Sequence, residues 1–169
     1  QLVVTERVTN FKEYYFGFPQ SSQVYGYNAY KWDHAEIATK DILHTFEQFK
    51  GTSNANNVIL AGASQGGKLA VEFSIKRNVN VSGFIAVIPA IQDLSQFEKH
   101  LKENPVSGIK GCIITGDEDY FYEKTVELTQ LFKKYNLPCK FIVKEGLGHF
   151  FPADFTNLLK EAVDYILDY

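Results

Sequence analysis

The sequence predicts an α/β protein with a mainly parallel sheet of about five to six strands flanked by helices. Short runs of branched apolar residues, bounded by turn residues, are typical of strands buried on both faces. Between these runs, apolar side chains recur at steps of three and four residues, the spacing of an amphipathic helix. Strands that alternate with helices form βαβ units and a parallel sheet. Because 169 residues fit one domain, we expect residues 1–169 to fold as a single domain.

The first part of the chain is predicted to be extended and then helical. Residues 14–21 are aromatic and extended in character, and Gly17 and Pro19 interrupt them. Residues 32–50 carry apolar side chains at helical spacing. We expect Gly51 to end this helix as a capping glycine.

Strands and helices alternate through the rest of the chain. The strands are expected at residues 58–61, 84–88, 111–115 and 139–144. The helices are expected at residues 66–78, 94–103, 122–135 and 155–167, the last with the clearest helical pattern. In such sheets the functional site lies at the carboxyl ends of the strands.

Composition and motif content argue against several classes of function. The net charge of −3, without a Lys/Arg cluster, argues against nucleic-acid binding. No apolar run is long enough to span a bilayer, and no signal peptide is visible. Cys112 and Cys139 lie outside any CxxC motif or Cys/His cluster, so we expect two buried reduced thiols and no metal site. Reduced thiols favour a cytoplasmic location, and no cofactor is expected.

The segment GASQGG, residues 62–67, follows one predicted strand and opens a helix. The pattern G-x-S-x-G in that context predicts a sharp turn that exposes the Ser64 hydroxyl. We expect the positions of Gly62 and Gly66 to have no room for a larger side chain, because the strand and the helix nearly touch there. The alternative is a glycine-rich turn that only packs a helix tightly on the sheet.

Two later loops also follow predicted strands. The first, GDED at residues 116–119, offers an acid that could orient a histidine, although this segment taken alone favours a solvated acidic loop. The second contains His149 between Gly148 and Phe150, a setting that core packing explains poorly. By contrast, His44 and His100 lie in predicted helices among polar residues, and we expect both at the surface.

The order of the three loops, serine then acid then histidine, is that of the α/β-hydrolase fold. The segments GASQGG, GDEDYF and GLGHFFP resemble the nucleophile, acid and histidine loops of the small carboxylesterase, phospholipase and acyl thioesterase group. The segment PQSSQVYGYNAYKWD, residues 19–33, is similar to the stretch after the fourth strand of that group. The resemblance covers residues 14–169.

The resemblance implies that Ser64 is the nucleophile, His149 the base and Asp119 the acid. The family acid usually stands three residues after the glycine that ends the strand, which favours Asp119, with Asp117 as the alternative. The resemblance also implies that the backbone N–H of Gln65 is one oxyanion donor.

The family's second oxyanion donor comes from a His-Gly loop after the third strand, and no such pair precedes Ser64. Either residues 2–4 are a remnant of that strand, or the strand lies upstream of Gln1, as the lack of any Met suggests. We therefore expect an α/β-hydrolase fold without its N-terminal strands and oxyanion loop. Residues 1–16 would then contain a helix that leads into the fourth strand.

The expected activity is hydrolysis of a small-molecule carboxylic ester or thioester through an acyl-enzyme on Ser64. A peptidase of the same fold and a binding scaffold without catalysis are the alternatives. An aromatic acyl pocket is expected from five residues: Tyr25, Tyr30, Trp32, Phe150 and Phe151.

Overall fold

The computed structural model of the protein describes residues 14–52 and 57–168. Its contacts divide the chain into two compact units, Gln1–Asn56 and Asn57–Tyr169. The strand remnant predicted at residues 2–4 lies outside the described residues. So does most of the segment 1–16, in which the sequence predicts a helix. The single-domain organisation stays a prediction.

The first unit contains a short hairpin followed by one long helix. Strands β1 (Val24–Gly26) and β2 (Ala29–Tyr30) pair antiparallel, and α2 runs over Ala35–Thr52. The Gln23 side chain ties the hairpin to the start of the helix, since it accepts from the His34 N–H at 2.8 Å and donates to the His34 carbonyl at 3.2 Å.

The expectation that Gly51 ends this helix is wrong, because α2 continues through Gly51 to Thr52. One glycine in a last helical turn costs only about 1 kcal/mol relative to alanine, so it does not stop a helix by itself. Residues 14–22 form no strand or helix, although the sequence predicts an extended course for most of them.

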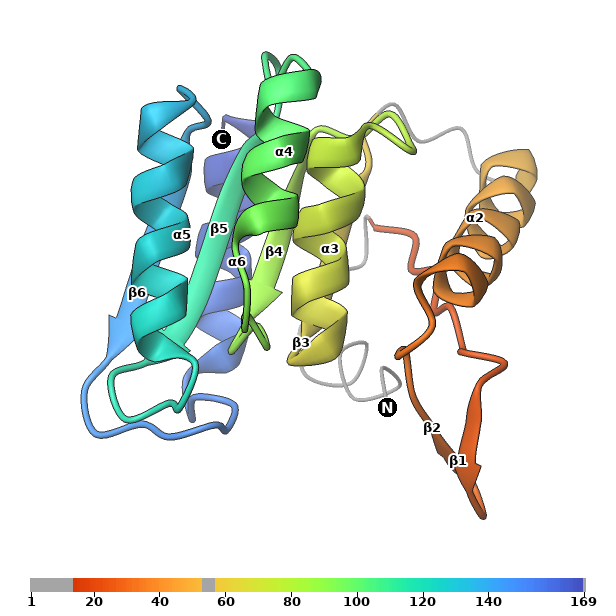
Figure 1. The fold of residues 1–169 in the computed structure, drawn as a ribbon, viewed down its shortest axis with the longest axis horizontal. Helices are drawn as coiled ribbons and strands as arrows, with labels where there is room; N and C mark the ends of the chain where they lie inside the picture. The colour runs from red at the N-terminus through yellow and green to blue at the C-terminus, as the bar shows by residue number, and fades with distance from the viewer. Residues whose placement is uncertain (1–13, 53–56, 169) are drawn as a thin grey trace. The chain divides into compact units, whose positions relative to one another are not determined.

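The second unit is a parallel sheet covered by helices on both faces. Its strands are β3 (Ile59–Ala63), β4 (Gly83–Val87), β5 (Lys110–Gly116) and β6 (Cys139–Lys144), in the order β3-β4-β5-β6. Its helices are α3 (Gln65–Lys76), α4 (Ser95–Glu103), α5 (Tyr122–Lys134) and α6 (Phe155–Leu167). Helices α3, α4 and α5 lie on one face of the sheet, and α6 lies on the other (Figure 1).

These elements confirm the predicted α/β class and the parallel sheet. The described residues supply four parallel strands, fewer than the five to six expected, and β3 pairs with β4 alone among them. Every residue of β4 is buried, as its run of apolar residues predicts. A buried cluster packs β4 and β5 against α3, α4 and α5, and Phe84, Phe97 and Phe132 are its largest fully buried side chains.

Both cysteines lie on neighbouring strands of this sheet and are free. The register pairs Cys112 with Lys140 and Cys139 with Gly111, so the two thiols point to opposite faces. Cys112 is fully buried, and burial raises the pKa of its thiol to about 12. Cys139 is partly exposed as a residue, but burial also raises the pKa of its thiol, so both sulfur atoms lie in apolar surroundings as expected.

His100 departs from the surface position expected for it, whereas His44 is exposed as predicted. The His100 side chain is 15% exposed, and its Nε2 atom is buried with no hydrogen-bond partner among the described residues. Because α4 packs against α3, this polar position on a short helix is covered by a neighbouring helix. Burial lowers the pKa of His100.

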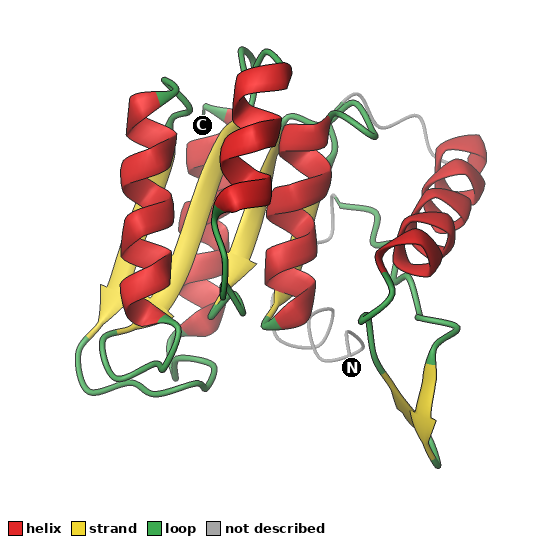
Figure 2. Ribbon diagram, in the orientation of Figure 1, coloured by secondary structure: helices red, strands yellow, loops and turns green. Residues whose placement is uncertain are grey.

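The loops that follow β3, β5 and β6 gather at one edge of the sheet (Figure 2), because parallel strands all end on the same side. Two of them carry the predicted acid and histidine, and the third carries Ser64. None of the helices within residues 14–52 and 57–168 has the length and apolar character needed to cross a membrane.

Candidate active site

Ser64 lies at the turn between β3 and α3 in a backbone conformation that few non-glycine residues adopt. Its φ of 52° and ψ of −118° fall outside the allowed regions for an L-residue. Two backbone hydrogen bonds hold it there: the Ser64 N–H donates to the Val87 carbonyl at 3.0 Å, and the Ala90 N–H donates to the Ser64 carbonyl at 3.1 Å. The end of β4 and the segment after it therefore fix the strained turn.

The glycines around Ser64 have different roles. A Cβ on Gly62 would lie 2.3 Å from the Gly66 carbonyl. The strand therefore lies too close to the helix for a side chain at position 62, as expected. The same expectation for Gly66 is wrong, since a Cβ there would meet nothing within 4 Å. Gly67 is the second tight position, with a Cβ 3.1 Å from the Gly62 carbonyl oxygen and 3.2 Å from that of Val87.

His149 links Ser64 to Asp119. Its Nε2 lies 3.0 Å from the Ser64 Oγ, and its Nδ1 lies 2.8 Å from the Asp119 Oδ2. The other carboxylate oxygen, Asp119 Oδ1, accepts a hydrogen bond from the Phe121 N–H at 2.8 Å. The Asp119 side chain is fully buried, so these two donors replace the water that a buried carboxylate lacks.

Asp117, the alternative acid, has a different partner. Its carboxylate accepts a hydrogen bond from the Gly146 N–H at 2.7 Å, which joins the acid loop to the histidine loop. The Glu118 N–H donates to the Leu147 carbonyl at 3.1 Å and so adds a second link. The geometry therefore favours Asp119 as the partner of His149 and gives Asp117 a role in joining the two loops.

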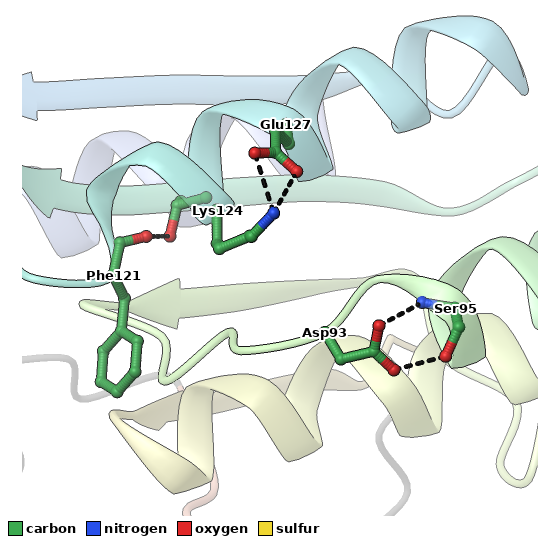
Figure 3. Close-up of polar contacts among 6 residues, drawn as sticks. Asp93, Ser95, Phe121, Lys124 and Glu127 are labelled. Carbon is green, nitrogen blue, oxygen red and sulfur yellow. Dashed lines mark hydrogen bonds and ion pairs between the residues drawn. The ribbon is translucent and has the colours of Figure 1, made fainter.

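Two aromatic rings that the sequence analysis did not single out lie against the His149 imidazole. The Tyr120 ring is 4.7 Å from the imidazole centroid at an interplanar angle of 30°, and the Phe121 ring is 5.6 Å away at 69°. Figure 3 shows the Phe121 ring directed away from α5, with its carbonyl held at the start of the helix by the Thr125 hydroxyl. The only sequence signal is that both residues directly follow the acid.

The predicted pocket residues are divided between the two units. Phe150 and Phe151 follow His149 in the chain and are 74% and 54% exposed, so they are apolar surface of the histidine loop. Tyr25 and Tyr30 lie on the hairpin of the first unit, and Trp32 follows it. A pocket that combines all five stays a prediction.

Gln65 is the first residue of α3, directly after Ser64. Its backbone N–H thus lies at the N-terminus of the helix, where the helix dipole favours negative charge. Among the described residues, no group of His, Cys, Asp and Glu side chains is placed to hold a metal ion.

Comparison with solved structures gives likenesses over most of the chain. An uncharacterised protein of Bacillus cereus has a TM-score of 0.88 and 27% identity over 99% of this chain and 56% of its own. SOBER1 of Arabidopsis thaliana has a TM-score of 0.62 and 20% identity over 77% of this chain and 63% of its own. An α/β serine hydrolase homologue of Coxiella burnetii has a TM-score of 0.60 and 19% identity over 82% of this chain and 62% of its own.

The chain therefore spans less than two thirds of the length of each of these three structures. No family model matches the sequence, and no curated protein matches it. At identities of 20% and below, the likenesses to the plant and Coxiella proteins are likenesses of fold alone.

Proposed function

The chain has the α/β-hydrolase fold, and we propose that it is a serine hydrolase that cleaves carboxylic esters or thioesters through an acyl-enzyme on Ser64. The observation that carries the proposal is the hydrogen-bonded series from Asp119 through His149 to Ser64, with distances of 2.8 Å and 3.0 Å. The strained backbone of Ser64 at the start of α3 supports it, since strain of this kind collects at functional sites.

In the proposed first step, the Ser64 Oγ attacks the carbonyl carbon of the substrate. The hydroxyl proton passes to Nε2 of His149, and the carbonyl oxygen takes up the negative charge. With Nδ1 protonated, the imidazole donates to Asp119, which keeps Nε2 free to accept from Ser64. The buried carboxylate then stabilises the imidazolium that forms.

The tetrahedral intermediate collapses when the bond to the alcohol or thiol breaks, and His149 returns the proton to that leaving group. Water then attacks the acyl-enzyme and gives a proton to His149, which passes it to the Ser64 Oγ as the acid leaves. The N–H of Gln65 is the proposed oxyanion donor, and one such donor is typically worth about 3–4 kcal/mol. The second donor that the family resemblance implies stays a prediction.

The proposed substrate is a small molecule with an apolar acyl or alcohol group. The support for this is the exposed apolar surface that Phe150 and Phe151 form after His149 in the chain. A peptidase would use the same series of side chains. Turnover of a peptide without turnover of an ester would therefore favour a peptidase over the proposed esterase.

The test compares the protein with a Ser64→Ala variant on p-nitrophenyl esters of increasing chain length and on an acyl thioester. We expect turnover and labelling by a fluorophosphonate probe in the protein, and loss of both in the variant. Ser95 is a suitable control because its hydroxyl bonds to Asp93 at the start of α4. Ser95→Ala should keep both signals. Equal turnover by the Ser64→Ala variant would refute the proposal, and absence of labelling in the unmodified protein would favour the binding scaffold.

A further inference from the structure

Tyr120 has an unusual environment for a large aromatic residue, because it is 74% exposed and yet lies against a proposed catalytic side chain. Its ring is 4.7 Å from the His149 imidazole, with the two planes 30° apart. The Phe121 ring meets Tyr120 at 4.7 Å and 61°, so the three rings are in mutual contact. Core packing does not account for Tyr120, since most of its surface faces solvent.

The contact of Tyr120 with His149 distinguishes the two charge states of the imidazole. The face of a phenol ring carries partial negative charge, and it attracts a cation within about 6 Å of its centroid. Neutral imidazole gains little from this electrostatic attraction, whereas imidazolium gains all of it. In acyl transfer by a Ser-His-Asp series, the imidazolium exists only in the transition state and the intermediate that follows.

We propose that Tyr120 is a positioning residue that stabilises the imidazolium of His149 and limits rotation of the imidazole ring. Asp119 holds the Nδ1 end of the ring, and Tyr120 covers one face, so that Nε2 stays directed at Ser64. The effect on catalysis rests on the proposed function, but the contact between the rings and its effect on protonation do not.

The titratable and charged groups that face His149 are few in the described structure. From the acid loop they are the Asp119 carboxylate and the Tyr120 phenol, and from the turn before α3 the Ser64 hydroxyl. Asp117, in the same loop as Asp119, is engaged by the Gly146 N–H. Replacing the Tyr120 ring therefore removes one interaction with the imidazolium and leaves the ion pair with Asp119 in place.

The experiment is an NMR titration of the four histidines in the full chain, with His149 assigned by comparison with a His149→Asn variant. Tyr120→Leu keeps an apolar side chain and removes the ring, and Tyr120→Phe keeps the ring and removes the hydroxyl. We expect the titration midpoint of His149 to fall by about 0.5 pH unit in Tyr120→Leu, from the strength of an exposed cation–π contact. Tyr120→Phe and Tyr120→Trp should restore the midpoint.

His100 reports in the same spectra, and because burial lowers its pKa in the folded protein, an unchanged His100 titration shows that each variant is folded. An unchanged His149 midpoint in a folded Tyr120→Leu protein would overturn the proposal. So would an equal fall of the midpoint in Tyr120→Phe, because the hydroxyl rather than the ring would then be responsible.

Ester turnover supplies the second readout. We expect kcat to fall about two- to fivefold in Tyr120→Leu with little change in KM, and the acidic limb of the pH profile to move to lower pH. A rise in KM alone, with an unmoved profile, would identify Tyr120 as a substrate contact and overturn the positioning role. If the unmodified protein turns over no ester, the proposed function fails, and the NMR titration still decides whether Tyr120 acts on His149.

Discussion

The backbone of Gly62 lies directly against the Gly66 carbonyl, so that a methyl group on Gly62 would come within 2.3 Å of the Gly66 oxygen. Real Cβ atoms do not come this close to a backbone atom. Gly66 has the opposite environment, because its own missing side chain faces open space. The two glycines of the G-x-S-x-G pattern therefore tolerate substitution differently.

Gly62→Ala and Gly66→Ala form a matched pair that tests this difference. Gly62→Ala has to separate β3 from α3, and we expect a loss of at least about 2 kcal/mol in the free energy of unfolding. Gly66→Ala adds a better helix former to the first turn of α3 and should gain about 0.5–1 kcal/mol. Urea unfolding measures both. Equal losses in the two variants would contradict the packing described.

Asp117→Asn and Asp119→Asn make the same chemical change at the two candidate acids. In Asp119→Asn the amide cannot stabilise an imidazolium and favours the wrong tautomer of His149, so kcat should fall by about 10⁴-fold. In Asp117→Asn the amide oxygen can still accept from the Gly146 N–H, and we expect kcat within about threefold of the unmodified protein. The measurement is kcat in steady-state ester hydrolysis. A larger loss of kcat in Asp117→Asn than in Asp119→Asn would identify Asp117 as the catalytic acid.

The ion pairs of Glu98 should make the free energy of unfolding depend on pH, independently of the Ser64–His149–Asp119 site. Hydrogen bonds from Lys134 and Lys102 lower the pKa of Glu98 from its ordinary 4.5 to about 2. Because the folded protein binds this proton less readily than the unfolded chain, the stabilisation is present above pH 4.5 and is lost as the pH falls toward 2. The Lys134 contact at 2.8 Å joins α5 to α4.

Glu98→Gln should unfold at a lower urea concentration than the unmodified protein at pH 6, and the difference should shrink as the pH falls from 4.5 to 2. The difference should also be smaller in high salt, since these side chains are partly exposed and screened. A difference that stays constant from pH 6 to pH 2 would show that the Glu98 charge is not its cause.

Much of the second unit could be predicted because the signals for its elements are local. The bounds of β6 at Cys139–Lys144 and of α6 at Phe155–Leu167 are those expected from hydrophobic spacing. The approach of Ser64, Asp119 and His149 could be expected as well, since each follows a strand and parallel strands end at one edge.

The features that escaped prediction depend on contacts between distant residues. No periodic pattern marks Tyr120, whose position against His149 follows from the path of two loops. The pattern GASQGG does not reveal that Gly67 rather than Gly66 is the second crowded position. His100 is covered because α3 lies beside α4, and composition along one helix carries no information about its neighbour.

The links between the acid loop and the histidine loop also have a mechanical consequence. Asp119 and His149 follow adjacent strands, β5 and β6, whereas Ser64 follows β3, with β4 in between. The Gly146–Asp117 and Glu118–Leu147 bonds make the first pair a stiff assembly. Any strain that spreads the sheet therefore acts mainly on the gap between Oγ and Nε2. A loosened protein would keep its imidazole–carboxylate pair intact and lose only the activation of the hydroxyl.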